Sequence, residues 1–267
     1  MRSGVLIKLQ SYAIIMHIDE NSGMMTECVV RRRYGMNGIM NWWLEFADTF
    51  EKCFIREDRY MLLLDGIGVT IKISLLAVII GIAIGLVIAF CNLSKSKLAN
   101  LVGKVYTDVI RGTPSVTQLM IIYFVVFATV NWEKWLIAAI AFGINSGAYV
   151  SEIIRAGILS IDKGQTEAGR SLGLSGAQTM TNIVIPQAVK NIFPALCNEF
   201  IVLIKETAIV GYIGIVDIQK AGDFIKSATF EAFMPLIATA IIYFVLIKIL
   251  TLAMSRVEIA LRKSEAR

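Results

Sequence analysis

Histidine is nearly absent from this chain, and charged residues are scarce. His17 is the single histidine among 267 residues, and only 18% of the residues are charged. A soluble domain usually contains about 25% charged residues, so the low share argues against an ordinary soluble fold. One histidine cannot build a multi-histidine metal site, and histidine-based catalysis is close to excluded.

Cysteine pairs and a phosphate-binding loop are missing as well. The four cysteines are scattered and include no CxxC pair, so their spacing indicates neither a zinc site nor a convincing set of disulfide bonds. No GxxxxGK[ST] stretch occurs, so the chain does not bind ATP by that means. No set of nucleophile, base and orienting residue can be assembled around His17. We therefore expect a chain that is not an enzyme and has no catalytic residues, metal ligands or cofactor of its own.

Hydrophobic residues dominate what is present. They make up 56% of the chain, and the mean hydropathy is +0.67. Residues 73–91 contain no charge over 19 positions, and at about 1.5 Å per residue such a helix crosses a hydrocarbon core of about 30 Å. In such a chain, a net charge of +5 indicates how the protein is oriented in the membrane rather than a surface that binds nucleic acid. The composition predicts an all-α integral membrane protein.

Further hydrophobic stretches follow the first one. The fourth is the weakest, because Glu199 interrupts it, and residues 206–231 after it are expected to form a polar, glycine-containing loop. Residues 257–267 form a basic tail. We expect five transmembrane helices within residues 67–256, at about 67–91, 112–131, 135–159, 188–205 and 232–253.

The N-terminal residues divide into two parts. Residues 36–66 are expected to form an interfacial amphipathic segment, because Trp42, Trp43, Phe46 and Phe50 alternate with charges at roughly helical spacing. Residues 1–35 are an N-terminal extension with two open interpretations. Its arginine triplet anchors the chain to anionic lipid, or the segment is a leader ahead of a translation start at residue 36 or 40.

Lysine and arginine are distributed unevenly between the expected spans. Short cytoplasmic loops of membrane proteins carry an excess of these residues. The three basic segments lie on one side of the membrane if the N-terminus is outside and the C-terminus is cytoplasmic. They contain Lys95, Lys97, Lys104 and Arg111; Lys163, Arg170 and Lys190; and Arg256, Arg262, Lys263 and Arg267.

The middle basic segment, residues 160–187, is a polar interruption with the signals of a short capped helix. Asp162 is placed to cap the helix, and Gln165 stands three residues later, as in a capping box. Gly173 is free to adopt the left-handed conformation that ends many helices. The pattern predicts a first short cytoplasmic helix that stops at this glycine.

A second set of helix signals follows directly. Ser175 and Gln178 repeat the capping-box spacing, and Pro186 is expected to end this helix because it cannot continue the hydrogen-bond ladder. Residues 160–187 are therefore expected to form a rigid cytoplasmic knob of two short helices.

The knob also contains a spaced motif: an E-A-G triplet, three residues, a glycine, nine residues, and I-x-I-P. This resembles the EAA signature of ATP-binding-cassette (ABC) importer permeases, which is EAA, x3, G, x9, I-x-L-P. The chain departs from it mildly at Gly169, for alanine, and at Ile185, for leucine. The matching positions are Glu167, Ala168, Gly169, Gly173, Ile183, Ile185 and Pro186.

Other segments narrow the resemblance, which covers about residues 60–256. They resemble the polar amino-acid permease subfamily, whose importers carry histidine, glutamine, glutamate, arginine, cystine or opines. Asp162 stands where the subfamily usually has proline. The matching segments are RGTP at 111–114, NSGAY at 145–149, EI at 152–153, RAGI at 155–158, SLGLS at 171–175, PQA at 186–188 and NEF at 198–200.

The resemblance implies a type I (MetI-like) permease fold in a bacterial cell membrane. In that family the EAA loop inserts into a groove on separate ABC ATPase subunits, which hold the ATP and Mg²⁺. A second permease copy or sibling permease, an extracytoplasmic amino-acid-binding protein and membrane lipid are the further expected partners, and nucleic acid is not expected. The alternative is a secondary transporter or channel that acts without an ATPase.

A polar face on the expected third span is the candidate translocation path. At 100° per residue, Asn145, Tyr149 and Glu152 fall within about 60° of one another. Gly143 and Gly147 fall on the opposite face, which suits close packing on a neighbouring helix. A polar face in lipid is costly unless it looks onto a cavity or a partner, so we expect it to line the path.

The acidic residues of the expected spans allow a second interpretation. Glu152 lies three residues before Arg155, and the two side chains can form a structural ion pair near the inner interface. Glu199 in the fourth span is open to the same two interpretations, and Lys205 is near enough in sequence to extend toward the membrane surface rather than pair with it. The sequence alone does not decide between path-lining and structural roles.

Overall fold

The structure is a computed structural model that describes residues 7–9, 12–14 and 38–263. It divides into two units, Met1–Asp48 and Thr49–Arg267. In the first unit, β1 (Ile7–Leu9) pairs antiparallel with β2 (Tyr12–Ile14), with Lys8 opposite Ala13. This short ribbon is an exception to the expected all-helical chain. The arginine triplet at residues 31–33 lies outside the described residues.

Helix α2 (Gly38–Phe50) crosses the boundary between the two units. Its aromatic residues are exposed, and the Trp42 and Phe46 rings stack with their centroids 5.5 Å apart. Exposed rings on an amphipathic helix are the arrangement expected of an interfacial segment. The membrane placement of residues 36–66 stays a prediction.

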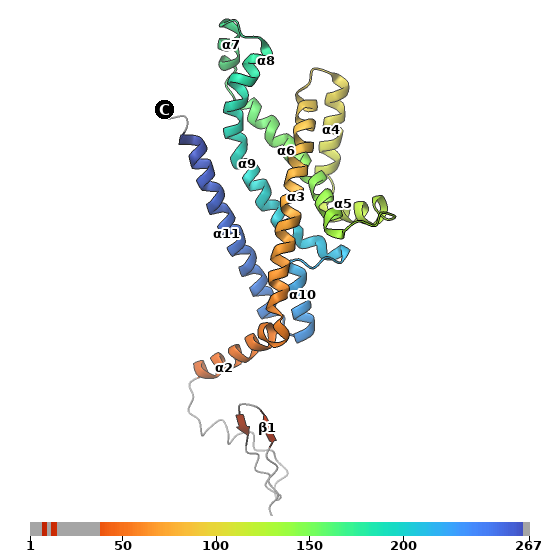
Figure 1. The fold of residues 1–267 in the computed structure, drawn as a ribbon, viewed down its shortest axis with the longest axis vertical. Coiled ribbons are helices and arrows are strands. Elements are labelled where there is room, and N and C mark those ends of the chain that lie inside the picture. Colours follow the sequence, from red (N-terminus) through yellow and green to blue (C-terminus); the bar gives the residue numbers. More distant parts are fainter. Residues whose placement is uncertain (1–6, 10–11, 15–37, 264–267) are drawn as a thin grey trace, which may run out of the picture. The chain divides into compact units, whose positions relative to one another are not determined.

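The second unit is helical, as the all-α expectation requires (Figure 1). Short π- or 3₁₀-helical turns, labelled η, lie between several of the α-helices. The elements are η1 (Glu51–Ile55), η2 (Arg56–Asp58), α3 (Tyr60–Leu93), α4 (Lys97–Arg111), α5 (Ser115–Ile121), η3 (Ile122–Val126), α6 (Lys134–Leu159), α7 (Lys163–Ser171), α8 (Gly176–Thr179), η4 (Met180–Val184), α9 (Ile185–Glu206), η5 (Thr207–Ile213), α10 (Ile218–Thr229) and α11 (Phe233–Lys263).

Three helices of the described residues are long and apolar enough to cross a membrane: Tyr60–Leu93, Lys134–Leu159 and Phe233–Ala260. Helix α4 and the segment Ser115–Val126 together pass the same test, but a bend of 104° separates them. Proline at position 114 accounts for the break, because a helix rarely continues through the residue before a proline. Five spans and their sidedness therefore stay predictions.

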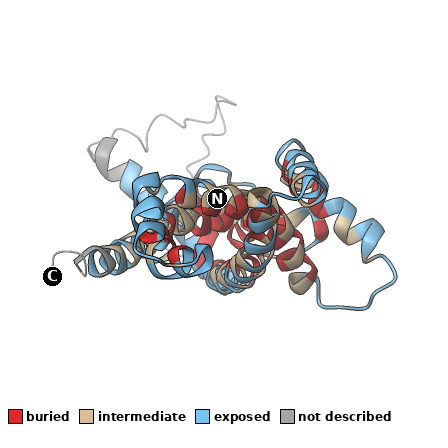
Figure 2. Ribbon diagram, turned by 90° about the horizontal axis from the view of Figure 1, so that it is seen from above, coloured by how far each residue is buried: buried red, intermediate tan, exposed pale blue. Residues whose placement is uncertain are grey.

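Helices α3 and α6 form the most extensive helix pair and contain much of the main buried core. Buried residues, in red, gather where the helices pack together (Figure 2). A Cβ atom placed on Gly85 would lie 2.5 Å from Val150 Cγ1, and one on Gly143 would lie 2.5 Å from Ile80 Cγ2. Both helices thus present glycines to the other, as small residues allow at helix interfaces. The predicted packing role of the Gly143 and Gly147 face is confirmed.

The expectation of a loop at residues 206–231 was wrong, because η5 and α10 occupy most of it. Asp217 caps α10 through both carboxylate oxygens, which accept from the backbone N–H groups of Gln219 and Lys220 at 3.2 and 3.0 Å. The polar residues that suggested a loop lie on one side of α10, and apolar residues such as Ile225 are buried on the other. An amphipathic helix was therefore mistaken for a polar linker.

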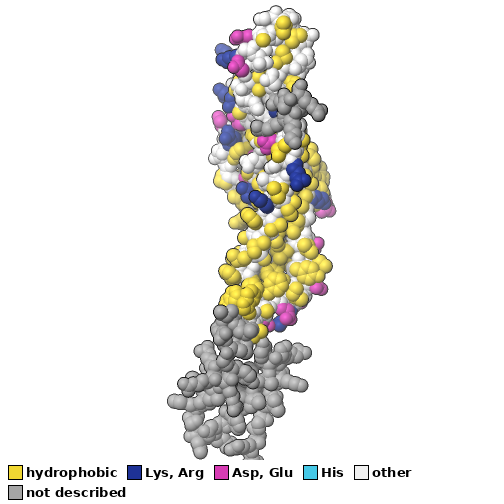
Figure 3. Space-filling model, turned by 90° about the vertical axis from the view of Figure 1, so that its left-hand side faces the viewer, with side chains coloured by type: hydrophobic (Ala, Val, Ile, Leu, Met, Phe, Trp, Pro, Cys, Tyr) yellow, Lys and Arg dark blue, Asp and Glu magenta, His cyan; other side chains and the backbone are white. Residues whose placement is uncertain are grey.

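The face on the side of α11 is largely hydrophobic (Figure 3). Exposed apolar side chains of this helix include Ile241, Phe244, Val245 and Ile249. A continuous apolar surface of this kind suits lipid or another apolar partner. In the same view, charged side chains lie over the upper half and at the lower end, and the largest hydrophobic area lies between them.

Candidate functional site

Helices α7 and α8 form the predicted knob, which lies beyond the ends of α6 and α9 (Figure 1). Asp162 caps α7, since its Oδ1 accepts from the backbone N–H of Gly164 at 2.6 Å. The prediction that the Gln165 side chain bonds back to the backbone of the capping residue was wrong. The Gln165 side chain instead accepts from Gln187 Nε2 of α9 at 3.5 Å, so it contacts the next helix rather than its own first turn.

The first knob helix ends at Gly173, as predicted. This glycine has φ +86°, a left-handed conformation in which a side chain is strained. The N–H of Leu174 donates to the carbonyl of Gly169 at 3.1 Å, and the N–H of Gly173 donates to that of Arg170 at 3.0 Å. These two bonds are the Schellman pattern that satisfies the last carbonyls of a helix.

The second knob helix has the predicted capping box. Gln178 N–H donates to Ser175 Oγ at 3.2 Å, and Ser175 N–H donates to Gln178 Oε1 at 2.8 Å. The expectation that Pro186 ends this helix was wrong, because the chain continues through η4 into α9. A π turn shifts the hydrogen-bond register, and the proline falls in the first turn of α9, where its missing N–H costs little.

Gly169 joins the two parts of the knob. A Cβ atom there would lie 2.8 Å from Thr179 Cγ2 and 2.9 Å from Ile183 Cδ1, so the residue is buried at a close contact. The departure from the alanine of the EAA signature thus lets α7 lie tightly against α8 and η4. Ile183 and Gly169, separated in sequence, are brought together as one packing contact.

The other motif residues divide between the surface and the root of the knob. Glu167 and Ala168 are exposed on α7, and Pro186 is exposed at the start of α9. Ile185 is half-buried beside it. The sequence interpretation missed Leu172, which is 82% exposed at the tip of α7. An apolar side chain on so polar a helix was the available signal, since exposed apolar groups often mark contact points.

Asn145 of α6 is 4% exposed and is hydrogen-bonded to α5, next to the bend between α4 and α5. Its Nδ2 donates to Gln118 Oε1 at 2.9 Å. Gln118 Nε2 in turn donates to the Ile110 carbonyl and to Thr113 Oγ1, each at 2.7 Å. Gln118 thus satisfies backbone carbonyl groups that the bend removes from the helix ladder, and Asn145 holds the Gln118 amide in place.

Tyr149 and Glu152, one and two turns further along α6, are only half-buried. Arg155 pairs with Glu152, with Nη2 2.7 Å from Oε2, and the guanidinium of Arg111 stands 5.3 Å from the centre of the Tyr149 ring. The predicted ion pair is therefore present. Its side chains are 27% and 37% exposed, for Glu152 and Arg155, so the pair borders open space rather than a closed core.

Glu199 lies apart from these three residues, on α9. It is 7% exposed, and its Oε1 accepts from Ser146 Oγ of α6 at 2.8 Å. Sequence reasoning missed Ser146, although it follows Asn145 directly in the NSGAY segment. The two adjacent residues bind different neighbours, since Asn145 contacts α5 and Ser146 contacts α9.

Comparison with known proteins identifies the family. Residues 81–263 match the family described as "Binding-protein-dependent transport system inner membrane component". The chain belongs to this family. Among curated relatives of this permease family, "Arginine transport system permease protein ArtQ" of Bacillus subtilis is 42% identical over 205 residues, covering 76% of this chain and 94% of the relative.

Relatives named for glutamine are similar to a comparable degree. "Putative glutamine transport system permease protein GlnP" of Rickettsia bellii is 40% identical over 204 residues, covering 76% of this chain and 94% of the relative. "Glutamine transport system permease protein GlnP" of Escherichia coli is 36% identical over 200 residues, covering 74% of this chain and 91% of the relative.

Solved structures agree with the permease fold. "Crystal structure of an amino acid ABC transporter with histidines" contains a chain 45% identical to this one, with a TM-score of 0.71, covering 77% of this chain and 97% of that one. A chain of the inward-facing "MetNI methionine ABC transporter" is 18% identical with a TM-score of 0.65, covering 76% of this chain and 97% of that one. At that identity the second likeness shows the fold alone, which is the MetI-like fold predicted from the sequence.

Proposed function

We propose that this chain is the permease subunit of an ATP-driven amino-acid importer in a bacterial cell membrane. It forms the path along which a polar amino acid crosses, by alternating between outward- and inward-facing states. The observation that carries the proposal is the family match over residues 81–263. The glutamine and arginine permeases among its relatives, each covered over more than nine-tenths of its length, support the amino-acid class.

The knob of residues 160–187 is the element proposed to couple this chain to ATPase subunits, which bind the ATP and Mg²⁺. Local hydrogen bonds satisfy its caps and turn, so it moves as one stiff piece. Exposed Glu167 and Leu172 give it a charged and an apolar contact for a groove. A stiff projection of this kind transmits a push from a partner to the helices beneath it.

The membrane arrangement proposed for the chain has five spans, an outside N-terminus and a cytoplasmic C-terminus. The excess of lysine and arginine in the three basic segments supports this sidedness. One chain supplies half a pore, so a second permease copy or a sibling permease completes it. An extracytoplasmic amino-acid-binding protein delivers the substrate.

Asn145, Tyr149, Glu152 and Glu199 are proposed to line or support the translocation path. Tyr149 and Glu152 are the better candidates for substrate contact, because they are half-buried and border open space. Asn145 and Glu199 are buried and hydrogen-bonded to other helices, so they hold the helices that line the path in position rather than contact the substrate. A zwitterionic substrate needs both donors and acceptors, which a carboxylate, a guanidinium and a phenol supply.

Co-purification tests the coupling role of the knob. We expect wild-type permease to retain its ATPase subunit through affinity purification, and Glu167→Lys or Gly173→Asp to lose most of it. Glu133→Lys is the matched control, because it makes the same charge change at an exposed residue on the opposite side of the proposed membrane. Retention of the ATPase by Glu167→Lys at the wild-type level would reject the coupling assignment.

Uptake measurements test the path. Glu152→Gln is expected to lower amino-acid uptake while leaving assembly with the ATPase intact, because it removes a charge at the polar face. Unchanged uptake would reject the path assignment for Glu152. Solute movement by the chain with no ATPase present would favour the alternative, a secondary transporter or channel.

A further inference from the structure

Strained backbone is concentrated in two neighbouring segments of the second unit. Among the described residues, Glu57, Asp58 and Phe230 are the non-glycine residues with positive φ, at 59°, 50° and 59°. Non-glycine residues rarely adopt this backbone conformation, and such strain persists only where the surrounding structure holds it in place. Strained residues of this kind are common at binding sites.

A small network of charged groups holds the two strained segments together. Lys52 Nζ lies 3.0 Å from Glu231 Oε1, which joins η1 to the residue after Phe230. Arg59 Nη1 donates to the Lys52 carbonyl at 2.7 Å, and its Nη2 donates to Glu57 Oε2 at 2.8 Å. The arginine thus supports the turn that contains Glu57 and Asp58.

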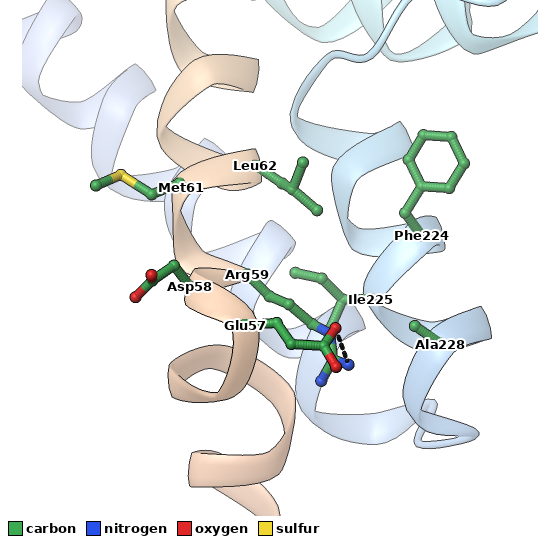
Figure 4. A pocket seen from close by; sticks show the side chains of 8 residues that line it. All are labelled: Glu57, Asp58, Arg59, Met61, Leu62, Phe224, Ile225 and Ala228. Carbon is green, nitrogen blue, oxygen red and sulfur yellow. Dashed lines mark hydrogen bonds and ion pairs between the residues drawn. The ribbon is translucent and has the colours of Figure 1, made fainter.

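A hollow of about 480 Å³ lies where this turn meets α10 (Figure 4). Met61 and Leu62 from α3 and Phe224, Ile225 and Ala228 from α10 give it apolar walls. The turn supplies charge at its rim, where the Glu57–Arg59 pair crosses toward α10 and Asp58 lies at the other edge.

The rim is acidic. Glu57 shares its charge with Arg59, but Asp58 makes no hydrogen bond or ion pair within the described part of the chain. Of the three charged residues that line the hollow, Glu57 and Asp58 are acidic and Arg59 is basic. This balance favours a cationic group as occupant and disfavours the headgroup of an anionic lipid.

We propose that this hollow is a docking point for the extracytoplasmic solute-binding protein, which inserts a lysine or arginine side chain. The apolar stem of such a side chain would pack against the walls, and its cationic head would pair with the Asp58 carboxylate. Phe230, 94% exposed two residues after Ala228, gives the same partner an adjacent apolar contact. The assignment rests on the proposed function and on the outside placement of residues 49–66.

The test uses the complete importer, with permease and ATPase subunits, reconstituted in lipid nanodiscs. The half-saturating concentration of the loaded binding protein is measured from its stimulation of ATP hydrolysis. We expect Asp58→Lys to raise this concentration at least tenfold, with the maximal rate and the rate without binding protein unchanged. Asp65→Lys is the matched control, because Asp65 is exposed on α3 outside the hollow and should leave the concentration at the wild-type value.

A gentler variant covers the case in which Asp58→Lys disturbs folding. Asp58→Asn keeps a residue type that tolerates positive φ, so the turn should be preserved. The half-saturating concentration should rise with salt in the wild type and rise less steeply in Asp58→Asn.

The outcomes separate the two levels of the proposal. Equal values for Asp58→Lys and Asp65→Lys, or equal salt slopes for wild type and Asp58→Asn, would overturn the docking point. The proposed function would stand if the wild type is still stimulated. A wild-type complex that is not stimulated by any loaded binding protein would overturn both.

Discussion

The knob of residues 160–187 and the buried polar residues Asn145 and Ser146 of α6 are stabilised in different ways. In the knob, the caps and the turn are satisfied by partners only a few residues away, such as Ser175 and Gln178. On α6, Asn145 and Ser146 bind partners 27 and 53 residues away. The knob is thus stiff by itself, whereas the bonds of Asn145 and Ser146 depend on the assembled helices.

This difference separates the effects that a mutation should have. A change at Asn145 or Ser146 of α6 removes contacts between helices and should lower the stability of the whole permease. A change in the knob alters a local structure that projects from the bundle, so it should affect coupling more than stability. The following variants test that separation.

The largest effect is expected at the contact between α3 and α6. Gly85→Val places a side chain where even a Cβ atom lies 2.5 Å from Val150 Cγ1 and 3.1 Å from the Ser151 backbone nitrogen. Overpacking of this kind should cost about 3 kcal/mol. Denaturant unfolding in detergent micelles measures it. Gly68→Val is the control, since nothing lies within 4 Å of its Cβ position, and equal stability of the two variants would contradict the close packing.

A smaller effect is expected from Ser146→Ala. The change removes the hydroxyl that donates to the buried Glu199 carboxylate, and a hydrogen bond to a charged group contributes about 2 kcal/mol. The same unfolding assay applies. Ser227→Ala removes an exposed hydroxyl and should change stability by less than about 0.5 kcal/mol. A Ser146→Ala variant as stable as Ser227→Ala would show that the bond between α6 and α9 is not important.

Gly173→Ala should weaken the knob without weakening the bundle. A methyl group finds open space there, so the cost is the backbone strain of a left-handed conformation, about 1.5 kcal/mol. Hydrogen exchange of the α7 amides should accelerate about tenfold, while that of α3 stays unchanged. Gly176→Ala, in an ordinary helical conformation, is the control. Loss of protection in α3 as well would contradict the independence of the knob.

The smallest effect is expected at the capping box. Ser175→Ala removes the side-chain acceptor for the Gln178 N–H and should cost about 1 kcal/mol, seen as about fivefold faster exchange in α8 and η4. Ser171→Ala, an exposed position on α7, is the control. Equal exchange in the two variants would show that the cap does not stabilise the second helix.

The same contrast explains which features could be predicted from the sequence. The cap at Ser175 and the left-handed Gly173 follow from rules about residues a few positions apart, and both predictions were confirmed. The prediction for Pro186 was wrong, because such rules do not foresee a π turn that moves proline into the next helix. Helix α10 was missed because its capping residue, Asp217, and its buried apolar side lie within a segment whose polar and glycine residues suggested a loop.

The distant partners of Asn145 and Ser146 could not be predicted. Nothing in the local sequence indicates that Gln118 satisfies the bend between α4 and α5, or that Glu199 binds Ser146. These contacts depend on how helices distant in sequence come together. The ion pair of Glu152 and Arg155 was among the expectations because it is local.

The most direct test of the central proposal is uptake of radiolabelled glutamine and arginine into proteoliposomes that contain the permease. We expect uptake of at least one of them when the ATPase subunit, the loaded binding protein and ATP with Mg²⁺ are all present. Omission of the ATPase subunit should reduce uptake to the background of empty liposomes. Equal uptake with and without the ATPase would contradict the proposal that this chain is the permease of an ATP-driven importer.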